Sequence, residues 1–220
     1  MTINNNRIRA AVLGSALALL SGAVVAAGTT TFAGDNVSYQ FDAGDLGLFG
    51  SASVVGGKLV FTPAGFTADG TSFFTSETIN VTVNADPGYV LAGFSLLETG
   101  SYTGDSAYAT GTFTAIDIEG TTGNQLPVSF NGVNASGTWT AGALITLPAS
   151  GWGGVDGVVT SVTLTLSNQL FAADESSILK DGVSISATAL AVPEADTYAM
   201  LLAGLGLVGF MTRRRTGRAV

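Results

Sequence analysis

Apolar and polar residues alternate one by one along several stretches of the chain. This is the pattern of β-strands that bury one face, because successive strand side chains point to opposite sides. The clearest stretches are residues 78–84 and 161–167. The apolar members of these two stretches, expected in the core, are Ile79, Val81, Val83, Val162, Leu164 and Leu166.

Further short strands are expected between turn-forming dipeptides such as Gly56-Gly57 and Asp181-Gly182. These strands are at residues 37–41, 51–55, 58–62, 89–97, 107–118, 128–130, 138–147 and 183–189. Only residues 170–179 are expected to form a helical turn or two. About ten short strands with turns between them predict an all-β fold, an antiparallel β-sandwich of jelly-roll type, over residues 28–191.

The N-terminus has the composition of an export signal. Two arginines precede an apolar stretch at residues 10–25, and small residues follow it. This order is typical of a cleavable signal peptide. We expect residues 1–27 to be removed by cleavage after Ala27, with Ala26 or Ala33 as alternative positions.

The C-terminus has three parts in a fixed order: a polar motif, an apolar run at residues 198–211, and the basic cluster Arg213, Arg214 and Arg215. Arginines directly after an apolar helix resist transfer across a membrane and stay on the cytoplasmic side. We expect a short transmembrane helix over residues 197–212. The alternative is a core helix, which a run of only 14 residues would also allow.

The polar motif consists of Val192, Pro193, Glu194 and Ala195. Together with the apolar run and the arginines, it resembles the PEP-CTERM protein-sorting signal, in which Val-Pro-Glu-Pro precedes a short helix and an Arg-rich end. Ala195 stands where that motif has its second proline. The resemblance covers residues 192–220. It implies an exported protein of a Gram-negative bacterium that makes exopolysaccharide, with an exosortase as its processing partner.

Charge and composition exclude several functions for residues 28–191. Two lysines and 14 carboxylates give this body a net charge of −12, which disfavours binding to nucleic acid. The chain contains no cysteine and no histidine, so thiol nucleophiles, imidazole bases and the usual zinc ligands are missing. We expect no enzymatic activity. A glycosidase pair formed by Asp117 and Glu119 is the alternative.

Two kinds of ligand are considered for the body. Asp35, Asp42 and Asp45 lie close together in the sequence and offer hard oxygen ligands for Ca²⁺, although their spacing matches no calcium-binding loop. Sugar contact requires exposed aromatic rings, for which the candidates are Trp139, Trp152, Tyr102 and Tyr108, with Trp152 and Tyr102 preferred and burial in the core as the alternative for the tryptophans.

Among the aromatic residues, Trp139 has the same strand parity as its apolar neighbours and is expected in the core rather than in contact with sugar. Taken together, these features predict a non-enzymatic surface or extracellular-matrix protein, as in a biofilm. It is exported through the inner membrane and transiently anchored by its C-terminal helix. The alternative is a carbohydrate-binding module that recognises exopolysaccharide.

Overall fold

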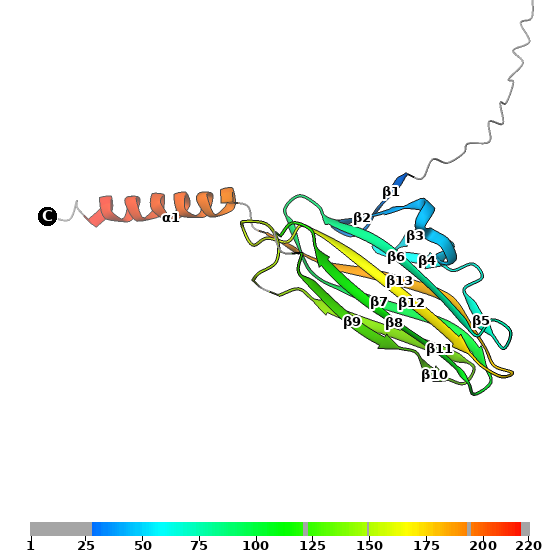
Figure 1. Cartoon of the computed structure of the whole chain (residues 1–220). Helices are drawn as coiled ribbons and strands as arrows, with labels where there is room; N and C mark the ends of the chain where they lie inside the picture. Colours follow the sequence, from blue (N-terminus) through cyan, green and yellow to red (C-terminus); the bar gives the residue numbers. More distant parts are fainter. Residues whose placement is uncertain (1–27, 121–122, 149, 193–194, 217–220) are drawn as a thin grey trace, which may run out of the picture.

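The computed structural model describes residues 28–120, 123–148, 150–192 and 195–216. It is predominantly β, with antiparallel strand pairing throughout its two sheets (Figure 1). The six-stranded sheet contains, in spatial order, β1 (Thr29–Ala33), β2 (Val37–Asp42), β6 (Phe74–Ala85), β12 (Ser161–Ala172), β8 (Ala107–Asp117) and β9 (Gln125–Asn131). The seven-stranded sheet contains β10 (Val133–Ala135), β11 (Thr138–Thr146), β7 (Tyr89–Thr103), β13 (Ser177–Ala191), β4 (Lys58–Thr62) and β3 (Ser51–Val55), with β5 (Thr67–Asp69) also paired to β13.

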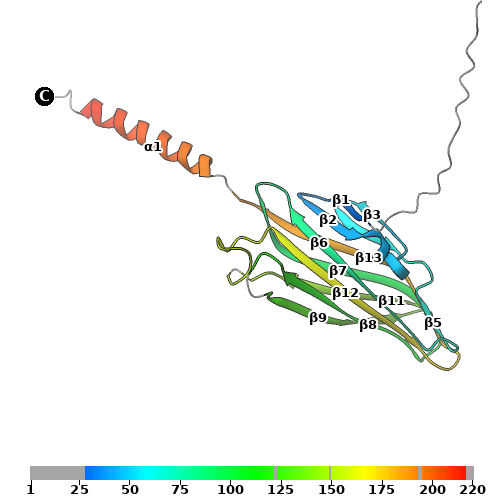
Figure 2. The same cartoon turned by 45° about the horizontal axis from the view of Figure 1, so that its top comes forward.

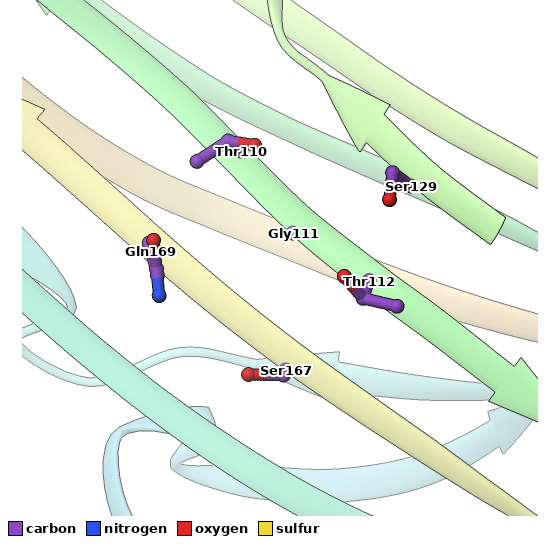
Figure 3. Close-up of a pocket in the computed structure, with 6 residues that line it drawn as sticks. All are labelled: Thr110, Gly111, Thr112, Ser129, Ser167 and Gln169. Atoms are coloured by element: carbon purple, nitrogen blue, oxygen red, sulfur yellow. The ribbon is translucent and has the colours of Figure 1, made fainter. Parts of the chain in front are cut away.

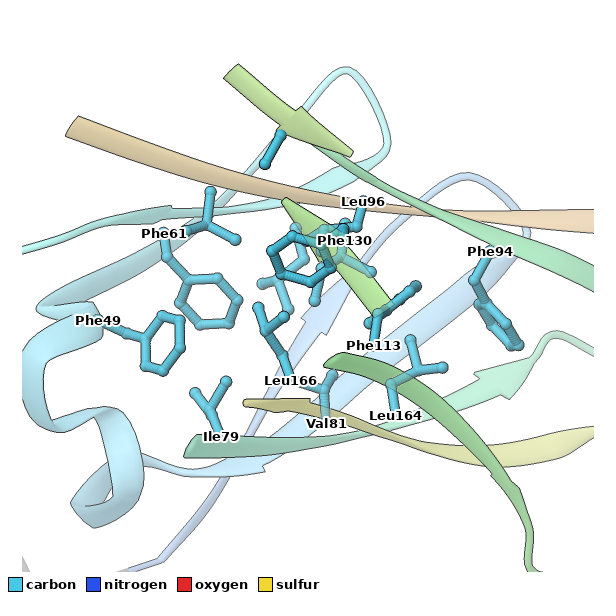
Figure 4. Packing of buried hydrophobic residues seen from close by; sticks show 14 of the residues in the cluster. Phe49, Phe61, Ile79, Val81, Phe94, Leu96, Phe113, Phe130, Leu164 and Leu166 are labelled. Carbon is cyan, nitrogen blue, oxygen red and sulfur yellow. The ribbon is translucent and has the colours of Figure 1, made fainter. Parts of the chain in front are cut away.

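The two sheets lie in two layers with one apolar core between them (Figures 1 and 2). Phe41 of one sheet and Phe61 of the other pack with ring centroids 5.8 Å apart. The predicted core is confirmed, because all six residues named from the alternation are at most 1% exposed. Figure 4 shows Ile79, Val81, Leu164 and Leu166 among the phenylalanines of this core. Trp139 is 1% exposed, as its parity predicts.

The chain alternates between the layers along most of its length. β6, β8 and β12 belong to one sheet, while β4, β7, β11 and β13 belong to the other. Strands that are consecutive in the sequence therefore face each other across the core more often than they pair. This order confirms an antiparallel all-β fold but does not confirm the jelly-roll topology.

The prediction that residues 170–179 form a helical turn or two is wrong, because strands β12 and β13 and the turn between them occupy these residues. Leu170 and Ala172 still alternate with exposed neighbours at the end of β12, and Ile178 is buried near the start of β13. Burial on one face therefore decides the conformation there. A 3₁₀ helix, η1, instead occupies Ala43–Phe49. The Asp42 carboxylate caps it by accepting a hydrogen bond from the Gly44 N–H at 2.8 Å.

The predicted C-terminal helix forms as α1 (Ala195–Thr216), which extends away from the sheets in Figures 1 and 2. Its apolar side chains from Met200 to Met211 are 59% exposed or more. Within the described residues, no helix has both the length and the apolar character that crossing a membrane requires. The transmembrane part of the prediction is therefore not borne out. The predicted signal peptide lies outside the described residues.

Candidate functional site

The two aromatic residues chosen from the sequence for sugar contact do not form a platform. Trp152 is only 5% exposed and belongs to the core, as the alternative of core packing predicts, so it presents no ring face for sugar contact. Flanking glycines indicated a loop, but the ring folds inward because its large apolar area gains most from burial. Tyr102 is half-buried and packs against the same core.

A different set of aromatic residues lies on the outer face of the six-stranded sheet. In the strand register Phe74 of β6 is opposite Phe171 of β12, which is opposite Tyr108 of β8. The rings of Tyr108 and Phe171 stack with centroids 4.9 Å apart. Tyr108 and Phe74 are 51% and 53% exposed. We call these three residues the aromatic row. Sequence reasoning named Tyr108 as a candidate but missed Phe74 and Phe171, because the three residues come from three strands that only the register brings together.

A shallow polar hollow lies next to the aromatic row in the strand register, and Figure 3 shows the residues that line it. Its volume is about 130 Å³. Its lining comes from neighbouring strands of the same sheet and consists of Thr110, Gly111, Thr112, Ser129, Ser167 and Gln169. Gln169 pairs with Thr110 in the register next to the aromatic row. Hydroxyl and amide groups therefore stand beside stacked rings on one continuous face.

Beyond the hollow, the outer face continues as cross-strand polar pairs. Thr165 donates to the Asn80 side-chain oxygen at 2.7 Å, and the hydroxyl groups of Thr82 and Thr163 lie 3.2 Å apart. The outward positions of β6, β12, β8 and β9 carry no charged side chain. In a body of net charge −12, such a face can contact an uncharged polar ligand without electrostatic repulsion.

The carboxylates considered for catalysis hold loops in place. Asp117 is 2% exposed, and its carboxylate accepts hydrogen bonds from the N–H groups of Glu119, Gly120 and Gly153 at 3.0–3.1 Å. The Glu119 carboxylate accepts from the backbone and hydroxyl of Thr160. Both groups are thus engaged by the chain itself.

The calcium candidates do not assemble into a metal site. Asp42 caps η1. The described residues contain no group of three His, Cys, Asp or Glu side chains placed to hold a metal ion. The sequence placed Asp35, Asp42 and Asp45 near one another only along the chain.

A buried polar cluster lies between the sheets, formed by Glu98 of β7, Asn168 of β12 and Lys180 of β13. All three are at most 1% exposed. The Lys180 Nζ is 2.6 Å from Glu98 Oε2 and 2.6 Å from Asn168 Oδ1. It lies 5.1 Å from the ring centroid of Phe66 and 5.5 Å from that of Trp139.

Burial shifts both ionisable groups of the polar cluster toward their neutral forms. It raises the pKa of Glu98, and the nearby Lys180 and, to a smaller extent, the Asn168 side chain oppose this rise. It lowers the pKa of Lys180, and Glu98 opposes that fall. Glu98 Oε1 and Asn168 Nδ2 are buried without a hydrogen-bond partner among the described residues. Sequence reasoning counted Lys180 and Glu98 only as charges. The sequence signal that could have revealed the buried cluster is the position of Lys180 in a stretch of alternating apolar residues.

The remaining candidate is the tail. The backbone N–H of Val192 donates to the Gly88 carbonyl at 2.8 Å, which holds the first residue of the motif against the body. Residues 191–215 match the family model of the PEP-CTERM protein-sorting motif. The tail is a PEP-CTERM sorting motif.

A PEP-CTERM motif marks an exported protein that depends on an exosortase. The matched residues include the predicted sorting motif Val192, Pro193, Glu194 and Ala195 and the arginines at 213–215. Val192 is 44% exposed. Pro193 and Glu194, and the side chains of Ala195 and the three arginines, lie outside the described residues.

Other comparisons add little to the PEP-CTERM match. The sequence matches no curated protein. Among solved structures, the chain is similar to the enzymatically active domain of bacteriophage CBA120 tailspike protein 4, with 10% identity and a TM-score of 0.26. This match covers 74% of the present chain but 19% of the tailspike chain. A TM-score this low does not establish a shared fold.

Proposed function

We propose that the chain is an exported, non-enzymatic surface or extracellular-matrix protein, in which exosortase processing separates the β-body from the sorting tail. The observation that carries the proposal is the position of the PEP-CTERM motif. Its match begins at Ala191, where the last strand, β13, ends. A cut near Pro193 would remove the tail and leave every described strand intact.

The exposed apolar helix supports temporary anchoring before the cut. The large apolar side chains from Met200 to Met211 are mostly exposed. Transfer of this much apolar surface out of water is favourable, and both the lipid interface and contact with the processing enzyme would remove it from water. The three arginines then favour the cytoplasmic side of the membrane.

The state of the acids supports a role without catalysis. Asp117 and Glu119 use their oxygens to hold backbone and hydroxyl groups of neighbouring loops. A glycosidase needs two carboxyl groups that face a sugar bond from opposite sides. Carboxylates that are hydrogen-bonded to their own loops are poorly placed to act on a sugar bond in this way.

The outer face of the six-stranded sheet favours a second function, contact with exopolysaccharide. Sugars present apolar ring faces that stack on aromatic rings and hydroxyl groups that exchange hydrogen bonds with amides and hydroxyls. The aromatic row and the adjoining polar hollow offer both in one place. Because the face is uncharged, we assign it a neutral glycan segment rather than an acidic one.

The sorting proposal is tested by replacing Arg213, Arg214 and Arg215 with glutamine. We expect unprocessed precursor to accumulate, because each arginine that passes the centre of the membrane costs about 2.5 to 3.5 kcal/mol, and glutamine lowers this barrier to transfer of the tail. Intact-mass measurement of cell-associated and released protein reports the outcome. Arg218→Gln is the control for loss of one positive charge outside the cluster. Normal processing of the triple variant would contradict the proposed role of the arginines.

The glycan proposal is tested by Phe171→Ala and Tyr108→Ala, each measured for binding to exopolysaccharide from the producing cells. An aromatic contact contributes about 0.5 to 1.5 kcal/mol beyond its buried area, so we expect each change to weaken binding by about tenfold. Leu144→Ala is the matched control, because Leu144 is a 71% exposed apolar residue on the other sheet. Equal binding by all variants would exclude this face as the contact.

A further inference from the structure

The buried polar cluster needs an explanation that sorting and surface contact do not supply. Placing a lysine, a glutamate and an asparagine in an apolar core is unfavourable unless every polar atom finds a partner. Two polar atoms here, Glu98 Oε1 and Asn168 Nδ2, are without one among the described residues. Besides its contact with Glu98, the Lys180 amine donates a hydrogen bond of equal length to the Asn168 side-chain oxygen, so the amine and the carboxamide are in direct contact.

The geometry places a nucleophile against a carbonyl carbon. The Lys180 Nζ is 2.6 Å from Asn168 Oδ1, and that oxygen is bonded to Cγ at about 1.2 Å, so Nζ is at most about 3.8 Å from Cγ. This approaches the separation of about 3 to 3.5 Å of groups poised to react. Glu98 contacts the same Nζ. An amine, a carboxamide and a carboxyl group thus meet at one point.

The surroundings favour the reactive protonation states. Burial lowers the pKa of Lys180 and raises that of Glu98, so the pair tends toward a neutral amine and a neutral carboxylic acid. Only the neutral amine has a lone pair for attack. The carboxylic acid can donate a hydrogen bond to the carbonyl oxygen as negative charge develops there. The rings of Phe66 and Trp139 cover the amine and keep water from competing.

We propose that Lys180 and Asn168 join in an intramolecular isopeptide bond, with Glu98 as the catalytic residue. Nζ of Lys180 attacks Cγ of Asn168, and a tetrahedral intermediate forms. The amine proton passes through the Glu98 carboxyl group to the Asn168 nitrogen, which leaves as ammonia. One C–N bond forms and one breaks, so no oxidant or co-reactant is required. The products are the amide Nζ–Cγ and one molecule of ammonia.

The bond would connect the two sheets. Asn168 belongs to β12 of the six-stranded sheet, and Lys180 belongs to β13 of the seven-stranded sheet. The chain contains no cysteine, so disulfides cannot perform this role after export. A buried amide also converts two groups that are costly to bury into a neutral link. The glycine opposite Lys180 contributes, because a Cβ at Gly100 would collide with the Trp139 ring that covers the amine.

Digestion of the purified, denatured full chain with a lysine-specific protease tests the proposal. Lys58 and Lys180 are the only lysines, so Lys58 is an internal control for complete digestion. We expect cleavage after Lys58 and none after Lys180, because an amidated lysine lacks the charge that the protease requires. The fragment that begins at Leu59 should run through position 180 and be lighter than its sequence mass by about 17 Da, the mass of ammonia.

The variants Glu98→Gln and Glu77→Gln separate catalysis from general effects. Glu98→Gln keeps size and polarity but removes the acid, so we expect restored cleavage after Lys180 and no mass deficit. Glu77→Gln, which alters another carboxyl group on an inward strand position, should retain the deficit.

Cleavage of wild-type Lys180 as complete as that of Lys58 would overturn the proposal, and so would a deficit that maps to the Asn131-Gly132 turn. Protection of Lys180 with added rather than lost mass would mean another modification and would also overturn it. If Glu98→Gln fails to fold, the wild-type digest still decides, because it is carried out on denatured protein.

Discussion

Polar side chains on the two faces of the six-stranded sheet lie in different surroundings, and β12 carries polar side chains on both faces. On its outer face Thr163 and Thr165 pair with hydroxyl or amide groups of β6 in contact with water. On its inner face Asn168 meets Lys180 and Glu98 in the core. Water can replace a lost partner outside but not inside. The inner polar groups should therefore control stability, and the outer ones should control contact with ligands.

The largest effect is expected from Glu98→Ala. This change leaves the Lys180 amine without its carboxyl partner and, by the proposal above, without the bond to Asn168, so it should lower the free energy of unfolding by at least about 3 kcal/mol, the lower end of the range for removing one partner of a buried pair. Urea unfolding followed by circular dichroism measures it. The outer-face control Thr165→Ala should cost about 0.5 to 1 kcal/mol. Similar losses for the two variants would break the distinction between the faces.

Asp117→Ala should have the next largest effect. The buried carboxylate accepts three backbone N–H groups, from Glu119, Gly120 and Gly153. Its removal leaves donors near the core without partners, at about 1 to 3 kcal/mol in total if water reaches part of the site. Urea unfolding gives the total. Hydrogen exchange of the Gly153 amide should rise at the same time, and unchanged protection there would show that another group holds this loop.

Phe171→Ser tests the outer face of the sheet, where we expect a small change in stability and a loss of glycan binding. Phe171 stacks on Tyr108 on the outer face, so little core packing is lost. Surface changes usually alter stability by about 0.5 kcal/mol, and we expect at most about 1 kcal/mol here. Glycan binding should fall as for Phe171→Ala. A loss of several kcal/mol would mean that the aromatic row is structural, which thermal unfolding would reveal.

The sequence predicted those features that depend on neighbours along the chain. Alternation identified β12 and its buried residues, because one buried face imposes a period of two. The PEP-CTERM tail was recognisable because its information is a linear order of residues. The prediction of a helical turn at residues 170–179 is wrong because burial of Leu170 and Ile178 on strand faces outweighs the local propensity for helix.

The candidate sites were missed because they are assembled by register and by packing between sheets. Phe74, Tyr108 and Phe171 are far apart in the chain and meet only as neighbours in three strands. Glu98 and Lys180 are separated by 82 positions and meet in the core. The sequence analysis counted both only as part of the net charge of the body. No short motif records a contact of this kind, so the sequence could predict the strands but not what their faces bring together.

The smallest effect is expected at Asp69, an exposed carboxylate at the end of β5. It accepts hydrogen bonds from the Thr71 N–H and hydroxyl and from the Ser72 N–H. The Thr71 hydroxyl bond is the main cause that lowers the pKa of Asp69 below its ordinary value of 3.8. Because the folded pKa is the lower one, the carboxylate contributes stability above pH 3.8 and loses it as the pH falls through the folded value.

Asp69→Asn removes this titration, so its melting temperature should fall less steeply than that of the wild type on acidification below pH 3.8. At neutral pH the two should differ only slightly, since water competes for every bond that Asp69 makes. Thermal unfolding of both proteins from pH 7 to pH 2.5 measures the difference. Parallel acid limbs would show that these exposed hydrogen bonds do not affect folding. A difference as large as that of Glu98→Ala would contradict the distinction between inner and outer polar groups.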